Sequence, residues 1–273
     1  MLEFIVVLRF LATCLITNSH FDAIYPIAAL ATGGVPGNSI FFFCSGYCLS
    51  KTDQKFFKWI IAKIKKLYIP LFIVLAVCCI LGFYEINTAS EFRKLFVFPT
   101  RYWFFPAILF GFIYMYSVTR LQENRRILVM AAAILVMLVR YYLADVSATG
   151  VEGDLLSRTL IYTIIMQIGY YCRQHIEKIE ASDWLCGIWV LGGVAGIYAW
   201  KYLENIFLFA YYTKYIEYVF LCLFAFSSFS ICMKHESDFK RMSKWGGGKP
   251  SGGFLSEHGK FIWFRYSLFT SCH

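Results

Sequence analysis

Residues 2–21, LEFIVVLRFLATCLITNSHF, decide the fold class, because they form an apolar segment long enough to cross a lipid bilayer as a helix. The strongly polar ionisable groups of this segment are Glu3, Arg9 and His20. A helix turns by about 100° per residue, so eleven positions bring Arg9 and His20 onto one stripe. A cation and an imidazole are costly in lipid and typically face a protein interior. The pair is therefore the first candidate for function.

This segment differs from a secretory signal sequence in three respects. Its start carries Glu3 where a basic leader would stand, Arg9 interrupts its apolar part, and no small-residue cleavage site precedes a polar mature domain. We expect the segment to be retained as a membrane span.

The composition extends this interpretation to the whole chain. The 273 residues are 59% hydrophobic and only 16% charged, which is more apolar than a soluble domain of this length. The apolar residues lie in long blocks at 2–21, 34–49, 67–84, 102–118, 127–144, 159–171, 184–200 and 206–233. We predict an all-α, polytopic transmembrane helical bundle of about eight spans that lies in the lipid bilayer.

The positive charges predict the orientation. Lys and Arg are concentrated in the segments 51–66, 120–126, 173–178 and 234–249, whereas the segment 144–156 has acidic residues and no Lys or Arg. The positive-inside rule then places both termini in the cytoplasm, with Arg93, Lys94 and Arg101 as exceptions. The net charge of +9 belongs to that face and requires no nucleic-acid partner.

The chain divides into a membrane domain, residues 1–235, and a polar, glycine-rich cytoplasmic tail, residues 236–273. Most of the ten cysteines lie in apolar segments, where they act as small packing residues. Cys44 and Cys48 share a helix face, but no His or carboxylate stands at ligand spacing, so we expect no metal site.

Arg9 and His20 each have a second interpretation. His20 could be a solvated histidine at the membrane interface, and the long side chain of Arg9 could reach water from within the span. If both residues bind one ligand, that ligand is long, because eleven helical rises separate their Cα atoms by ~16 Å. An extended pantetheine arm has this size.

The segment 51–66 has the pattern of an amphipathic helix at the cytoplasmic surface, and Pro70 is expected to begin the following span. The basic run Lys63-Ile64-Lys65-Lys66 fits either phosphate groups of a ligand or anionic lipid headgroups. A glycine-rich turn, 33–37, precedes the second span, in which Ser45 and Gly46 permit close helix approach. Ser45 lies in no strand-turn-helix elbow, so we do not expect a nucleophile there.

Together these motifs resemble the membrane acyltransferase-3 family. The resemblance rests on Arg9 and His20 with ten residues between them, the glycine-rich turn leading into the FFFCSGY segment at 41–47, the basic run before Pro70, and the RYWFFPA segment at 101–107. A softer match is the IGYY segment at 168–171. The resemblance covers roughly residues 5–235.

The resemblance implies an inner-membrane O-acyltransferase for acyl groups other than amino-acyl groups. Such proteins move an acyl group, commonly acetyl, from cytoplasmic acyl-CoA to a carbohydrate hydroxyl of a surface polysaccharide or its lipid-linked precursor. His20 would be the general base or a transient acyl carrier, and Arg9 would hold the pantetheine or thioester region. Lys63 and Lys66 would meet the nucleotide phosphates of CoA. Members usually have about ten spans, so we expect a shortened or altered C-terminal part.

Two other classes stay open. A transporter or flippase for a lipid-linked glycan would line a path for anionic groups with Arg9 and Arg140, but the inverted repeats typical of such folds are not visible. A non-catalytic membrane subunit is the third interpretation.

Overall fold

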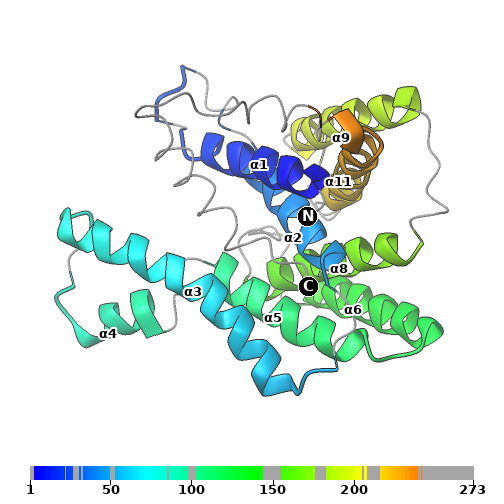
Figure 1. The fold of residues 1–273 in the computed structure, drawn as a ribbon. Helices are drawn as coiled ribbons and strands as arrows, with labels where there is room; N and C mark the ends of the chain where they lie inside the picture. Colours follow the sequence, from blue (N-terminus) through cyan, green and yellow to red (C-terminus); the bar gives the residue numbers. More distant parts are fainter. Residues whose placement is uncertain are drawn as a thin grey trace.

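The computed structural model describes residues 3–21, 23–26, 31, 33–49, 53–84, 86–97, 103–143, 155–175, 183–204, 206–207, 216–238 and 241. Within these ranges all regular secondary structure is helical, which confirms the predicted all-α class. The elements in chain order are α1 (Glu3–Asn18), α2 (Gly34–Tyr47), α3 (Phe56–Ile80), α4 (Ala89–Phe92), η2 (Arg93–Val97), α5 (Phe104–Val118), α6 (Glu123–Leu143), α8 (Leu155–Gln174), α9 (Asp183–Glu204) and α11 (Glu217–Lys234) (Figure 1).

The long helices coincide with the predicted apolar segments, although α11 occupies only the second half of the segment 206–233. Among the described residues, α6, the part of α9 from Asp183 to Trp200, and α11 are long and apolar enough to cross a membrane. The helix α5 is apolar but shorter. Most of the predicted tail, from residue 242 onward, lies outside the described residues.

The helices α2 and α8 cross at the centre of the bundle, between α1, α11 and α9 on one side and α5, α6 and α3 on the other (Figure 1). Glycines allow this crossing, because a Cβ atom at Gly46 would overlap the backbone carbonyl of Met166 and one at Gly169 would overlap that of Phe43. The predicted close approach at Gly46 is thus confirmed. Small residues at such a crossing bring two helix backbones into direct contact.

The central position of α8 explains its weak hydropathy pattern. Ser157, Thr159, Thr163 and Gln167 are all buried in it. Three of these side chains form hydrogen bonds within the protein: Thr159 donates to the Leu155 carbonyl and Thr163 to the Thr159 carbonyl, each at 2.7 Å, and Gln167 accepts from the Tyr114 hydroxyl at 2.6 Å. A helix enclosed by protein can carry polar groups that are satisfied in this way.

The helices α1 and α2 form an antiparallel pair. At one end the rings of Phe4 and Tyr47 meet with centroids 5.8 Å apart. At the other end, Gly33 approaches Leu15 so closely that a Cβ atom would lie 2.7 Å from the Leu15 carbonyl oxygen. The pair therefore has two distinct ends, one with aromatic contacts and one with close backbone contact.

The prediction of a helix through His20 was wrong, because α1 ends at Asn18. The helix ends through local polar bonds: the Ser19 hydroxyl donates to the Ile16 carbonyl at 2.7 Å, and the Tyr25 hydroxyl donates to the Asn18 side chain at 2.6 Å. His20 follows in a tighter turn, in which its backbone N–H donates to the Thr17 carbonyl at 3.1 Å. Such side-chain bonds compete with helical bonds and favour helix ends.

The prediction that Pro70 begins a span was also wrong, because α3 runs through Pro70 without interruption. A proline inside a helix removes one backbone hydrogen bond and crowds the preceding turn. Packing on both sides of it holds the helix together: Trp59, Ile60 and Leu67 are buried before Pro70, and Leu71 and Leu75 are buried after it. The predicted surface helix and third span are one element.

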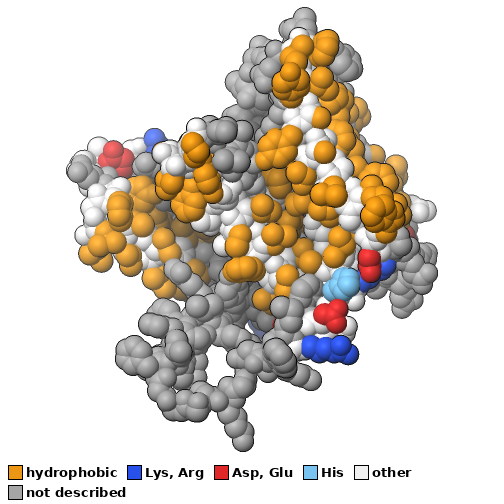
Figure 2. Space-filling model, turned by 90° about the horizontal axis from the view of Figure 1, so that it is seen from above, with side chains coloured by type: hydrophobic (Ala, Val, Ile, Leu, Met, Phe, Trp, Pro, Cys, Tyr) orange, Lys and Arg blue, Asp and Glu red, His pale blue; other side chains and the backbone are white. Residues whose placement is uncertain are grey.

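The outer helices expose apolar side chains. Only Met137 and Tyr141 are buried in the 21 residues of α6, whereas Leu135, Val136 and Val139 are exposed. Apolar side chains cover much of the described surface in Figure 2, and the charged ones in that view lie in two places, a few at the left and a larger group at the lower right. A surface of this kind is stable against lipid chains and not against water.

Candidate functional site

Arg9 lies on the buried face of α1. Its side chain is only 9% exposed, and it shares this face with Phe4, Ile5, Leu8 and Ala12. That face packs on α2 and α11, so Arg9 is directed into the bundle and not into lipid. Burial of a guanidinium is costly, and proteins keep such groups mostly for structure or for binding anions. Of the two interpretations of Arg9, the structure favours the interior one over a side chain that reaches water.

His20 lies at the opposite end of α1 from Glu3, and its side chain is exposed. It stands directly after Ser19, whose side chain lines a cavity at this end of the bundle. Arg9 and His20 are therefore not a catalytic pair in contact. One is enclosed between helices, and the other lies at the rim of the bundle.

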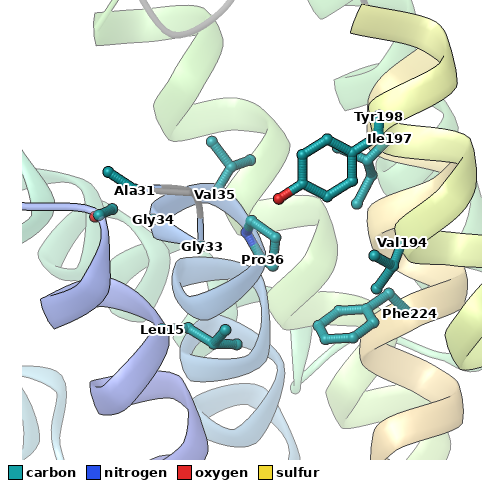
Figure 3. A pocket seen from close by; sticks show the side chains of 11 residues that line it. Leu15, Ala31, Gly33, Gly34, Val35, Pro36, Val194, Ile197, Tyr198 and Phe224 are labelled. Atoms are coloured by element: carbon teal, nitrogen blue, oxygen red, sulfur yellow. The ribbon is translucent and has the colours of Figure 1, made fainter. Parts of the chain in front are cut away.

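The cavity beside Ser19 has a volume of about 280 Å³. It is bounded by the end of α1, the glycine turn, the start of α2, and α9 with α11. The residues that line it are Leu15, Ser19, Ala31, Gly33, Gly34, Val35, Pro36, Val194, Ile197, Tyr198 and Phe224. Figure 3 shows Tyr198 on α9 across from Val35 and Pro36, with its hydroxyl directed toward the start of α2. The cavity is thus apolar with hydroxyl groups at its edge.

The glycine turn is required by this geometry. Gly33 has a φ of 130°, a conformation that residues with a Cβ atom rarely adopt. At Gly34 a Cβ atom would lie 2.9 Å from the Ser19 hydroxyl oxygen. The turn therefore brings the start of α2 against the end of α1 at backbone distance. We call this region, formed by Ser19, His20 and residues 33–36, the glycine end.

The predicted phosphate ligands Lys63 and Lys66 lie on α3, away from the glycine end. The Lys63 ammonium is partly buried, 5.6 Å from the centre of the Trp59 ring and 5.4 Å from that of Phe112. Lys66 is exposed. A lysine over two ring faces is stabilised by cation–π attraction and has a defined position.

Three arginines that the sequence did not predict as ligands lie at the same end of the bundle as Lys63. Arg126 donates to the Gln174 side chain at 2.6 Å and to the carbonyls of Leu121 and Thr119. Arg173 donates to the Tyr47 carbonyl at 3.1 Å, where α2 ends.

The third arginine is Arg120, whose guanidinium lies 3.4 Å from the centre of the Tyr116 ring. All three arginines belong to the basic segments 120–126 and 173–178. In the sequence these segments predicted the cytoplasmic face of the protein but not the contacts of single side chains. We call the region formed by Lys63, Arg120, Arg126 and Arg173 the basic end.

A further cation lies at the start of α8. The guanidinium of Arg158 is 4.5 Å from the centre of the Trp103 ring. The Trp103 ring stacks on the ring of Tyr162, and the Tyr162 ring stacks in turn on that of Phe42. Trp103 belongs to the segment 101–107 that carried part of the resemblance, so the stack gives this motif a packing role. Arg158 had no signal in the sequence, because nothing there joins it to Trp103.

The polar side chains of Ser45 and Gln167 have structural roles. Ser45 is buried, and its hydroxyl donates to the Phe41 carbonyl at 2.8 Å within the same helix. The Gln167 amide donates to the Arg126 carbonyl at 2.8 Å. The nine described cysteines are free thiols, and no cluster of three or more potential metal ligands exists in the part of the chain that the structure describes.

A helical bundle with lipid-compatible outer faces, one buried arginine and a separate basic end defines the chain as a helical membrane protein. Comparison with known families is specific: the acyltransferase-3 family model, described as an acyltransferase domain, matches residues 2–248. The chain belongs to this family of membrane acyltransferases. No curated protein and no solved structure matches it.

Proposed function

We propose that the protein transfers an acyl group, commonly acetyl, from cytoplasmic acyl-CoA to a hydroxyl of a surface polysaccharide or its lipid-linked precursor. The observation that carries this proposal is the separation of two chemistries between two regions of the bundle. The basic end suits the phosphates of a nucleotide, and the glycine end offers a histidine beside a cavity. Family membership supplies the acyl transfer. The product would be an ester, and we expect an acyl group other than an amino-acyl group.

Arg9 would hold the pantetheine arm of the donor between the two ends. Nine helical rises separate Arg9 from the end of α1 at Asn18, a distance of ~14 Å, and an extended pantetheine arm is long enough to span it. A buried guanidinium donates strong hydrogen bonds to the amide carbonyls and thioester oxygen of such an arm.

His20 would act as general base on the acceptor. Its imidazole takes the proton of the sugar hydroxyl, the hydroxyl oxygen bonds to the thioester carbonyl carbon, and the C–S bond breaks. The thiolate of CoA then takes the proton back from the imidazolium. An exposed histidine at the rim of the bundle is accessible to a large carbohydrate.

Lys63 and Lys66 would bind the nucleotide phosphates of the donor. Both lie on α3, three residues apart and so neighbours on the helix surface, and the positive-inside rule assigns the basic segments to the cytoplasm. The protein would then lie in the inner membrane with both termini cytoplasmic. Acyl-CoA is present on that side.

The proposal is tested by the acetyl content of surface glycan, measured by mass spectrometry in cells that carry each variant. His20→Ala and Arg9→Ala should lower acetylation at least a hundredfold while the protein remains in the membrane fraction. Suitable controls are His175→Ala and Arg125→Ala, which change a histidine and an exposed arginine at the basic end. Full acetylation by both site variants would contradict the proposal.

A further inference from the structure

The aromatic cluster at the basic end carries two cations, one on α3 and one in the turn after α5. Trp59 on α3 contacts Tyr116 and Phe112 on α5, with ring centroids 5.1 and 6.1 Å away. Lys63 lies over Trp59 and Phe112, and Arg120 lies over Tyr116. The sequence suggested only the lysines of α3 for phosphate binding, so the role of Arg120 is a new question.

Arg120 is held in a fixed position. Besides stacking on Tyr116, it donates to the Tyr116 carbonyl at 2.9 Å and to the Gln54 carbonyl at 3.5 Å. The Tyr116 hydroxyl donates to the same Gln54 carbonyl at 3.0 Å. The side chain is nevertheless exposed, so it is both ordered and accessible. A guanidinium presented in this way is suited to a phosphate, because its planar fork matches the phosphate oxygens.

The two cations lie at different depths. Phe112, which contacts Lys63, is one helical turn deeper in α5 than Tyr116, which contacts Arg120, a rise of ~6 Å. The nucleotide part of CoA carries its pyrophosphate next to the pantetheine arm and a separate 3′-phosphate on the ribose farther from it. A deeper and an outer cation correspond to this order.

We propose that Arg120 binds the 3′-phosphate of the CoA donor and that Lys63 binds its pyrophosphate. This inference rests on the proposed function and adds to it a second phosphate contact, from the turn after α5. It makes the 3′-phosphate a recognised group, so the protein distinguishes CoA from 3′-dephospho-CoA.

The test is equilibrium binding of CoA and of 3′-dephospho-CoA to the purified full-length protein in detergent. The wild-type protein should bind CoA about tenfold more tightly. Arg120→Ala should lose about tenfold in affinity for CoA and leave affinity for 3′-dephospho-CoA unchanged. Lys63→Ala should weaken both ligands, whereas the matched control Arg125→Ala, at another exposed arginine of this end, should weaken neither.

The outcomes separate this inference from the function on which it rests. If Arg120→Ala lowers affinity for both ligands equally, or for neither, the assignment of the 3′-phosphate is overturned. Equal binding of both ligands by the wild type also overturns it, while the proposed donor stands. If the wild-type protein binds neither ligand, both proposals fail. A merely structural role of Arg120 would change the thermal unfolding temperature without changing the ratio of the two affinities.

Discussion

The glycine end and the basic end of the bundle differ in the kind of contact that forms them. At the glycine end, backbone meets backbone: Gly33 and Gly34 lie directly on Leu15 and Ser19, and an apolar cavity opens beside them. At the basic end, long cationic side chains lie over aromatic rings, as Arg120 does over Tyr116. The glycine end depends on residues that have no side chain, and the basic end depends on long cationic side chains.

Under the proposed function, this difference would let one bundle bind both the acyl donor and the carbohydrate acceptor. Close backbone contact leaves little freedom, so the glycine end holds a fixed cavity edge next to His20. Stacked cations keep their charge at the surface and attract anions from solution. Between the two ends, Arg9 is the buried charge that a donor extending from one to the other would meet.

The largest expected effect comes from breaking the crossing that joins the two ends. Gly46→Ala places a methyl group in the backbone carbonyl of Met166, so α2 and α8 must separate. We expect a loss of about 3 kcal/mol in the free energy of unfolding, and loss of activity. Thermal unfolding in detergent measures the change.

The matched control is Gly192→Ala in α9, where a Cβ atom meets nothing within 4 Å among the described residues. It should be neutral or slightly stabilising, since alanine favours a helix over glycine. Equal effects of the two substitutions would show that the crossing does not determine stability.

A smaller effect is expected from the glycine end alone. Gly33→Ala imposes a side chain at φ 130° and places it against the Leu15 carbonyl. We expect a loss of about 2 kcal/mol, because one strained residue and one contact are affected. Acyl transfer should fall while CoA binding at the basic end is retained. Loss of both in parallel would mean that the two ends are not independent.

The basic end should tolerate change better. Arg126→Met removes three hydrogen bonds to Gln174, Leu121 and Thr119 at a partly exposed position. Because water replaces exposed bonds, we expect only about 1 kcal/mol of destabilisation. Unfolding temperatures of Arg126→Met and Arg125→Met, compared in one detergent, test this. If Arg126→Met destabilises the protein more than Gly33→Ala does, the basic end is the less tolerant of the two, and this prediction is contradicted.

The smallest effect concerns the capping box of α4, next to the end of α3. The Glu91 carboxylate accepts from the backbone N–H groups of Asn87 and Thr88, at 2.9 Å each. These bonds favour the charged form and lower the pKa of Glu91 from its ordinary value. The stabilisation is therefore complete above the ordinary pKa and is lost as pH falls through the lowered one.

Amide exchange at Asn87 and Thr88 measures this stabilisation. The wild-type protein should be better protected than Glu91→Ala at neutral pH, and the difference should disappear in acid. A difference that persists below the lowered pKa would contradict the role of the carboxylate.

The fold could be predicted from the sequence largely because membrane helices need long apolar segments. The segments 2–21 and 34–49 became α1 and α2 with small changes at their ends. The prediction failed where local polar bonds or packing decided the outcome: Asn18 and Ser19 end α1 early, and packing carries α3 through Pro70. Neither effect is visible in hydrophobicity.

The candidate site was predicted only in part. Arg9 and His20 could be predicted as candidates because ionisable groups are unusual in an apolar segment, and Lys63 and Lys66 because their basic run resembles that of the family. Arg120 could not be predicted as a ligand, because its position depends on the Tyr116 ring and its proposed role depends on Lys63 of α3. Contacts between helices are set by the fold and leave no local pattern.

The central claim is that the donor is held along α1 and reacts at its far end. The most direct measurement compares binding and transfer in one purified preparation, with radiolabelled acetyl-CoA and a carbohydrate acceptor. We predict that His20→Ala binds acetyl-CoA with wild-type affinity and transfers nothing, whereas Arg9→Ala loses affinity at least tenfold. Transfer by His20→Ala at the wild-type rate would contradict the account.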